Sequence, residues 1–287
     1  MQVKYLFSSY KEARKQNCSN EFLFLLQLKA AFPCGYVSGE NFLNEVQSKI
    51  PYSKGQISNL FKELIKIGWV EIWKRKDDRK WRYIIKSMKF VYNKLGFRFK
   101  KQNNYYRFKH IEILNKTKQQ IKAIIQGCEI LKNKRSQLFF ERKRLEARLI
   151  YHLKKQDTDK GNQKREAIIT SIKKELQDID NTLQTINGSQ TSDFQLIRSK
   201  ISLKKIASLL GNRSASVALK LNKTAEKDKL YQVNRFKTLI GTKIPLLDYL
   251  FGIKTQIKNT FWKFGNVYQI SCNSYCFNLQ NPGVSLT

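Results

Sequence analysis

Apolar residues alternate at intervals of three and four over two long stretches in the middle of the chain. The first stretch runs from Ile111 to His152, and the second runs from Ile169 to Ile186. This spacing places the apolar side chains on one face of a helix and is typical of helices that pack along their length. A polar, glycine-containing segment (156–163) separates the two stretches. The sequence therefore predicts an antiparallel hairpin of two helices, the first nearly twice as long as the second.

The unequal lengths leave the part of the first helix between Ile111 and Cys128 without a partner in the hairpin. A contiguous apolar surface of this kind is normally covered by another part of the protein or by a partner. We weigh two partners for it, the N-terminal domain of the same chain and a second copy of the chain in a homodimer. The sequence alone leaves both open.

The charge of the chain is far from balanced. Lys and Arg number 55 and Asp and Glu number 22, so the formal net charge is +33. A compact protein with this excess repels itself unless a polyanion neutralises it, and nucleic acid is the commonest such partner. A coding bias toward AT-rich codons would explain an excess of lysine over arginine, but not the shortage of acidic residues. We therefore expect nucleic acid as the partner.

Membranes, disulfides and metals are not expected. The sequence contains no run of 18 apolar residues and no signal peptide, and its most apolar stretch, 22–32, is interrupted by Gln27 and Lys29. The five cysteines form no Cys-x-x-Cys pair and suit a reducing compartment. Cys272 and Cys276 are expected on one face of a strand as buried apolar side chains. We expect a cytoplasmic, nucleoid-associated protein without a cofactor.

The N-terminal region has the pattern of three helices followed by a hairpin. Helices are predicted over 21–31 and 38–49, and a third begins at Lys54 after a capping box formed by Ser53 and Gln56. Gly68 ends the third helix. Two β-forming runs, 69–73 and 81–85, then enclose the basic segment 74–80 and predict a hairpin with a cationic tip.

Residues Ser53–Val70 resemble the recognition helix and wing entry of MarR-type winged helix-turn-helix proteins. The resemblance implies that the helix from Lys54 enters a major groove and that the hairpin contacts the neighbouring backbone or minor groove. Gln56, Ser58 and Asn59 would then read base edges, and the cations would mostly contact phosphates. The cations in question are Lys54, Lys62, Lys74, Arg75, Lys76, Arg79, Lys80 and Arg82.

The segment Phe90–Phe108 alternates aromatic and basic residues. Such a segment can stack unpaired bases and neutralise phosphates. Most aromatic side chains lie in protein cores, however. We therefore favour a further strand or helix that closes the first core.

A second helix-turn-helix pattern lies at Ser202–Leu221. Ala207 allows two helices to approach, Gly211 supplies a positive φ at the turn, and Val217 is expected to fill the core between them. The segment resembles the helix-turn-helix of phage and plasmid regulators but has Lys220 where they are usually apolar. A shifted helix phase would keep the motif intact; without it, the second unit would be structural. The candidate DNA-binding residues here are Arg213, Ser214, Ser216, Lys220 and Lys223.

A further hairpin is predicted near the C-terminus, where Gly265-Asn266 separates two β-forming runs. It would supply a second wing. Catalytic motifs are missing: the sequence has no His-x-His pair and no phosphate-binding loop of the Walker type. The acidic pairs Asp77-Asp78 and Asp157/Asp159 are expected in surface turns. We therefore expect a protein that is not an enzyme.

Together these patterns predict a mainly α fold with small β wings (α+β), in which two winged-helix modules are joined by an antiparallel helical hairpin. The expected domains are 1–108, 109–187 and 194–287. The expected function is sequence-specific double-stranded DNA binding by a transcription regulator of phage or plasmid type. A replication initiator with paired winged helices is an alternative, and a structural or RNA-associated protein that coats nucleic acid is a third.

Overall fold

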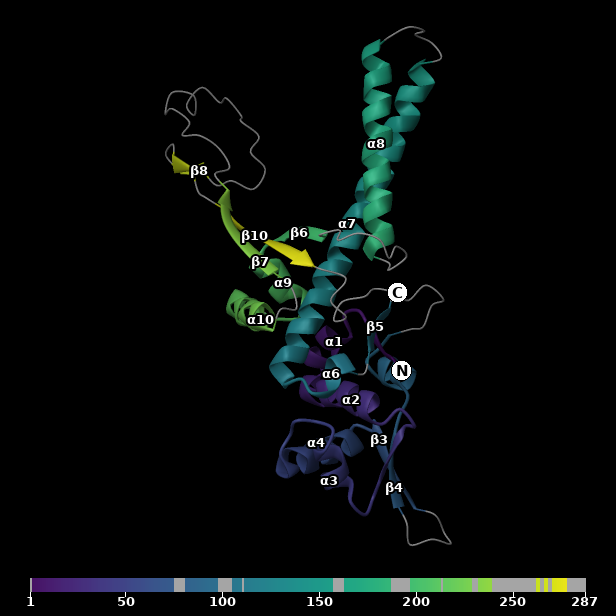
Figure 1. Cartoon of the computed structure of the whole chain (residues 1–287), viewed down its shortest axis with the longest axis vertical. Coiled ribbons are helices and arrows are strands. Elements are labelled where there is room, and N and C mark those ends of the chain that lie inside the picture. The colour runs from purple at the N-terminus through teal and green to yellow at the C-terminus, as the bar shows by residue number, and fades with distance from the viewer. Residues whose placement is uncertain are drawn as a thin grey trace.

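The computed structural model is mainly helical, with small antiparallel sheets, and is elongated. It describes residues 2–74, 81–97, 105–109, 111–156, 163–186, 197–212, 214–228, 232–238, 262–263, 266–267 and 270–277. A small three-stranded sheet lies at one end of the long axis and a helical hairpin lies at the other (Figure 1). No described helix is both long enough and apolar enough to cross a membrane.

The helices are α1 (Ser9–Lys15), α2 (Ser19–Ala31), α3 (Phe42–Gln47), α4 (Lys54–Lys66), α5 (Met88–Lys94), α6 (Ile111–Leu114), α7 (Lys118–Gln156), α8 (Gln163–Ile186), α9 (Leu203–Leu209) and α10 (Ala215–Lys227). The strands are β1 (Gln2–Leu6), β2 (Tyr36–Ser38), β3 (Val70–Lys74), β4 (Trp81–Ile85), β5 (Tyr105–Lys109), β6 (Ile197–Ile201), β7 (Gln232–Thr238), β8 (Trp262–Lys263), β9 (Asn266–Val267) and β10 (Ile270–Phe277). They pair as β1-β5, β2-β4-β3, β6-β10-β7 and β8-β9, always antiparallel.

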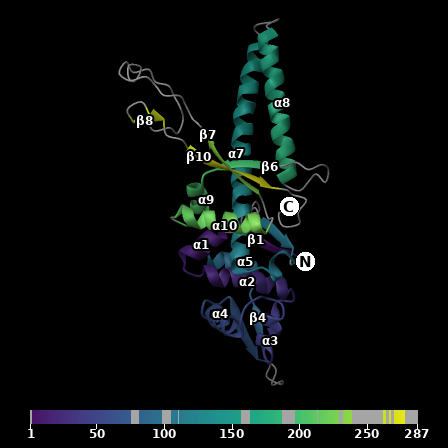
Figure 2. The same cartoon turned by 60° about the vertical axis from the view of Figure 1, so that its left-hand side comes forward.

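The predicted helical hairpin is confirmed. Helices α7 and α8 lie side by side and project away from the rest of the molecule (Figures 1 and 2). Their register is fixed by polar contacts: Arg165 donates to the carbonyl of Lys155, and Arg142 Nε lies 2.8 Å from Asp180 Oδ1. Of the apolar residues predicted to face the seam, Leu138, Leu145, Ile172 and Ile179 are buried, and Leu149 and Leu176 are partly buried.

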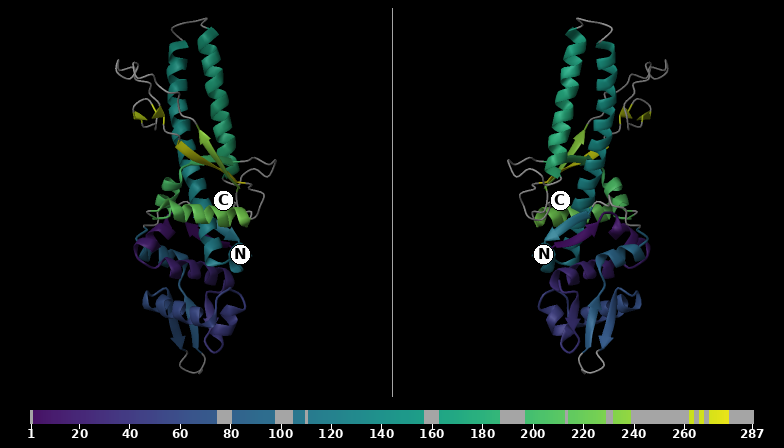
Figure 3. Two further views of the ribbon diagram at one scale, coloured as in Figure 1. Left: turned by 90° about the vertical axis from the view of Figure 1, so that its left-hand side faces the viewer. Right: turned by 90° about the vertical axis from the view of Figure 1, so that its right-hand side faces the viewer.

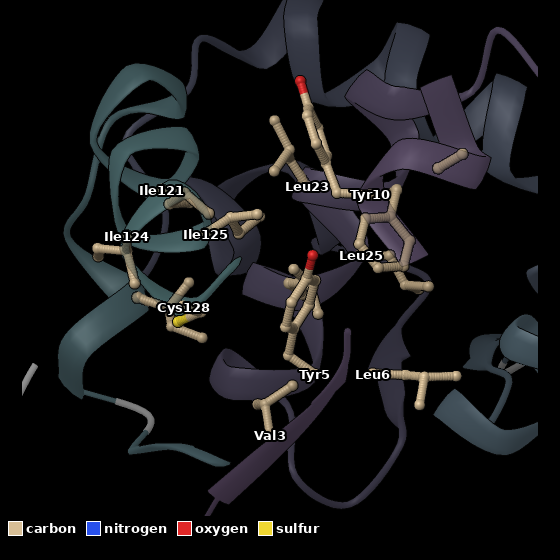
Figure 4. Close-up of a cluster of buried hydrophobic side chains, with 14 of the residues drawn as sticks. Val3, Tyr5, Leu6, Tyr10, Leu23, Leu25, Ile121, Ile124, Ile125 and Cys128 are labelled. Atoms are coloured by element: carbon tan, nitrogen blue, oxygen red, sulfur yellow. The ribbon is translucent and has the colours of Figure 1, made fainter. Parts of the chain in front are cut away.

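The other half of α7 is covered within the chain. Ile121, Ile124 and Cys128 are buried, and helix α2 packs on α7. Figure 4 shows the side chains of α7 in one buried cluster with Tyr5 of β1. Helices α9 and α10 pack on α7 as well, and α10 lies across it (Figure 3). Of the two partners considered for this surface, the N-terminal domain is therefore the one observed, and no second copy is needed to cover it.

A buried carboxyl group anchors β1 to α7. Glu129 Oε1 accepts a hydrogen bond from the Tyr5 hydroxyl at 3.0 Å and another from the backbone N–H of Ser8. Burial raises the pKa of Glu129, while the Ser8 hydrogen bond and the nearby Lys132 act in the opposite direction. This contact fixes the start of the chain against the centre of α7.

The β2-β4-β3 sheet departs from one prediction. The helix expected over 38–49 is wrong at its start, because β2 occupies Tyr36–Ser38 and α3 begins only at Phe42. Val37 is fully buried opposite Tyr83 of β4, so pairing with a sheet competes successfully with helix formation here. The expectation that the aromatic segment closes the first core is confirmed for α5, where Val91 is buried.

The same supersecondary unit occurs twice. The first unit is β2-α3-α4-β3-β4 and the second is β6-α9-α10-β7-β10, and in each the last strand lies in the middle of the sheet. The first strand and the two helices start at 36, 42 and 54 in one unit and at 197, 203 and 215 in the other, so the intervals are identical. Helix α2 packs on α4 in the first unit, and α7 packs on α9 and α10 in the second.

The C-terminal hairpin forms with a different turn from the predicted one. Lys263 pairs with Asn266, so Asn266 belongs to β9 and not to the turn. The strand predicted to contain Cys272 and Cys276 is confirmed as β10, the central strand of its sheet.

Candidate nucleic-acid interface

Helix α4 is built as its sequence predicts. The Ser53 hydroxyl accepts from the backbone N–H of Gln56 at 3.3 Å, and Gln56 Oε1 accepts from the backbone N–H of Ser53 at 3.1 Å. This capping box satisfies two backbone donors at the start of the helix. Ile57, Phe61 and Leu64 are buried, and the Phe61 ring packs on aromatic neighbours from α2 and α3. The opposite side of the helix is therefore fixed toward solvent.

Four exposed residues at intervals of four, three and four form the outward side of α4: Gly55, Asn59, Lys62 and Lys66. We call them the α4 face. Asn59 and Lys62 were predicted as contacts, whereas Lys66 was missed although its spacing from Lys62 places it on the same face. Of the other predicted residues, Lys54 and Gln56 are exposed in the first turn and Ser58 is half-buried.

The capping box limits what Gln56 can do. Bidentate recognition of adenine requires the oxygen and the nitrogen of one side-chain amide. The Gln56 oxygen already accepts a hydrogen bond from Ser53, so only its amino group remains for a ligand. Asn59 forms no side-chain hydrogen bond to another described residue. Asn59 is therefore the better placed of the two for reading a base edge.

A hollow of about 250 Å³ adjoins the α4 face. It is lined by Asn20, Tyr52, Gln56, Asn59, Leu60 and Lys118. Burial raises the pKa of Tyr52 to about 12, so its hydroxyl keeps its proton at neutral pH. Asn20 lies in the first turn of α2 and Lys118 in the first turn of α7. Sequence reasoning missed both, because only the tertiary structure brings them to α4.

The β3–β4 hairpin divides its cations between two faces. Lys74 pairs with Trp81 on the side that packs against the helices, whereas Arg82 pairs with Trp73 on the outer side. The Arg82 guanidinium lies over the Tyr36 ring, 4.7 Å from its centroid. Lys74 and Arg82 are both exposed. The predicted tip residues Arg75, Lys76, Arg79 and Lys80 lie outside the described residues.

The turn between α9 and α10 has the local geometry predicted for it. Gly211 has φ +71°, as predicted, and Ala207 is buried. The backbone N–H of Asn212 donates to the carbonyl of Ala207 at 2.8 Å and closes the end of α9. The Ser214 side chain accepts from the backbone N–H of Ser216 and caps α10. Arg213, predicted as a contact, lies outside the part of the chain that the structure describes.

The phase of α10 differs from the prediction. Val217 was expected to fill the core, but it is only partly buried, and Ala218, Leu221 and Ala225 supply the buried side. This shift turns Lys220 outward, so its charge is not buried. Lys220 stands where phage and plasmid regulators usually have an apolar residue, and the shifted phase of α10 keeps this lysine on the surface.

The outward side of α10 repeats that of α4. Ser216, Lys220, Lys223 and Lys227 are exposed at intervals of four, three and four, and we call them the α10 face. When the two units are aligned along the sequence by the residues at which their helices begin, Lys62 corresponds to Lys223 and Lys66 corresponds to Lys227. Helices α4 and α10 both lie on the left-hand side of the molecule in Figure 1. The chain therefore carries the same pattern of exposed lysines on two equivalent helices.

The described residues contain no group of three or more His, Cys, Asp or Glu side chains suited to hold a metal ion. The site therefore consists of amides, hydroxyls and cations. Comparison with protein-family models, with curated proteins and with solved structures gives no match for this chain.

Proposed function

We propose that the chain binds double-stranded DNA in a sequence-specific manner through the α4 and α10 faces, as a transcription regulator of phage or plasmid type. The observation that carries the proposal is the repetition of one helix face in two equivalent units, with lysines at equivalent positions. An α-helix fits into the major groove of duplex DNA. A helix with one buried and one cationic side can enter the groove with its cationic side toward the DNA. The net charge of +33 supports a polyanionic partner.

We further propose that both repeated units are winged-helix modules. Each unit has a strand, two helices and two further strands, with the last strand in the middle of the sheet. In this assignment α4 and α10 are the recognition helices, and the β3–β4 hairpin is the first wing. Asn59 reads a base edge, and Lys62, Lys66, Lys220, Lys223 and Lys227 contact phosphates. No catalytic step is part of the proposal.

The test begins with selection of bound duplexes from a random library, followed by affinity measurements on the selected site over a range of salt concentrations. Replacing Lys62 and Lys223 together with Gln removes two phosphate contacts. We expect the slope of log affinity against log salt to fall by about 2. Asn59→Ala should instead reduce the preference for the selected site over random duplex, at a cost of about 1–3 kcal/mol.

A matched control uses Lys173→Gln with Lys174→Gln, because both lysines are exposed on α8, away from α4 and α10. This variant loses the same charge and should keep both the salt slope and the site preference. An unchanged slope in the Lys62/Lys223 variant would refute the proposal. If RNA and the selected duplex bound with equal affinity, the result would support a protein that coats nucleic acid. If the selected sites occurred as clustered repeats at a replication origin, the result would support a replication initiator.

A further inference from the structure

The outer half of α7 exposes large aromatic side chains that no described element covers. Phe140 is 78% exposed and Tyr151 is 54% exposed. Both belong to the half of α7 that packs on α8. That hairpin projects away from α4 and α10 (Figure 2). The seam with α8 does not use them, because Leu138 and Leu145 are the residues buried there. Exposed aromatic rings of this size usually mark a binding surface.

Basic residues share the face of these rings. Phe140, Arg144, Arg148, Tyr151 and Lys155 recur at intervals of four, four, three and four, which places them on one side of the helix. We call them the α7 stripe. Its two aromatic residues are about 16 Å apart along the helix axis. Lys155 Nζ lies 4.9 Å from the centroid of the Tyr151 ring and lowers the pKa of the Tyr151 hydroxyl.

The charge of the hairpin is concentrated on α7. This helix has 11 basic and 3 acidic residues, whereas α8 has 4 of each. Of the three acidic residues, Glu129 is buried and Glu146 pairs with Arg142 at 3.2 Å. Within the described part of the chain, Arg144 and Arg148 form no ion pair. Glu141 lines the same hollow as Phe140 and Arg144, and the stripe with this residue still has a net positive charge beside exposed rings.

The exposed rings and the positive charge of the α7 stripe together favour a nucleic acid over a second copy of the chain as the ligand of this surface. A second copy of the chain would bring two cationic helices together, and their repulsion opposes a homodimer through this face. A nucleic acid is attracted instead. In a duplex the base faces are already stacked, so exposed rings add little, whereas unpaired bases stack on aromatic side chains while cations follow the phosphates.

We propose that the α7 stripe binds single-stranded nucleic acid, with bases stacked on Phe140 and Tyr151 and phosphates held by Arg144 and Arg148. The site is separate from the duplex interface proposed above, and either can exist without the other. It gives the protein two nucleic-acid surfaces of different kinds.

The experiment measures binding of the full chain to fluorescent oligothymidylate and oligouridylate of about 20 nucleotides. Phe140→Ala with Tyr151→Ala should weaken binding to both at least tenfold and leave affinity for duplex DNA unchanged. Phe140→Tyr with Tyr151→Phe keeps both rings and should retain binding. Arg144→Gln with Arg148→Gln should weaken binding and reduce its salt dependence.

The control variant is again Lys173→Gln with Lys174→Gln, which removes two charges from the other helix of the hairpin and should leave single-strand affinity unchanged. Far-UV circular dichroism checks that every variant keeps its helix content. Wild-type single-strand affinity in the Phe140/Tyr151 alanine variant would overturn the proposal. So would equal losses for duplex and single strands, or sedimentation showing that wild type is a dimer and the alanine variant a monomer.

Discussion

The two repeated units share one backbone plan but fill it with different side chains. In the first unit, aromatic rings make the core: Phe61 lies within 5.8 Å, centroid to centroid, of Phe24, Phe42 and Tyr83. In the second unit, the position equivalent to Phe61 is Asn222, and the neighbouring buried positions hold alanines. The comparison shows that a helix arrangement can be preserved when its core chemistry is replaced.

The difference follows from what covers each unit. Phe61 of α4 lies against the aromatic side chains of α2 and α3, whereas α10 lies directly on the long helix α7. Small residues such as Ala218 and Ala225 allow that close approach, and Gln126 of α7 donates to Asn222 Oδ1 at 2.6 Å. The first unit therefore shares an aromatic core with α2, whereas the second packs small apolar residues and a buried polar contact against α7.

The largest effect is expected from Phe61→Ala. The ring is almost fully buried, so its removal leaves a cavity among the surrounding rings and should lower the free energy of unfolding by about 3–5 kcal/mol. Three of the four tryptophans, Trp69, Trp73 and Trp81, lie in the first unit. Urea denaturation followed by tryptophan fluorescence therefore reports this change. A loss below about 1 kcal/mol would contradict the view that aromatic packing holds this unit together.

Asn222→Ala tests the equivalent position in the second unit. It removes one hydrogen-bond acceptor of the buried Gln126 amide, so we expect a loss of about 1–3 kcal/mol and faster hydrogen exchange in α10. Replacing Asn222 and Gln126 together with Leu is the control, because it removes both polar groups and should recover most of the loss. If the single and double variants were equally unstable, the hydrogen bond would not be the contact that matters.

The smallest effect is a pH dependence at the contact between α2 and the first unit. Lys29 Nζ donates to the carbonyl of Ile85 at 2.8 Å, and burial lowers its pKa from 10.5 to about 8. Between these values the unfolded chain binds more protons at this site than the folded one, so stability should rise with pH. In Lys29→Met this contribution disappears. Urea midpoints of both proteins across this range give the difference, and parallel curves would show that Lys29 does not titrate as described.

Local signals in the sequence predicted local structure well. The capping box at Ser53, the turn at Gly211 and the helical hairpin each depend on residues close together along the chain, and each is observed. Helix phase was harder to predict. Val217 and Leu221 are both apolar, and only packing against α7 decides that Leu221 is buried and Val217 only partly buried.

The features that join distant segments could not be predicted. The repeat is almost invisible in the sequence, because its shared residues are few: Ser53, Leu60, Lys62 and Lys66 match Ser214, Leu221, Lys223 and Lys227. In each unit these residues are the cap of the second helix, one apolar residue of its inner side and two exposed lysines. Asn20 and Lys118 reach the α4 face only because α2 and α7 begin beside it. No local pattern carries that information.

Helix α7 also sets a mechanical relation between the two ends of the protein. Its 39 residues form a single continuous rod of about 58 Å, with one end embedded beneath α10 and the other in the projecting hairpin. Because a continuous helix resists bending, a change of angle at the embedded end is carried to the far end as a larger displacement. Whatever tilts the embedded end of this rod therefore also moves the tip of the hairpin.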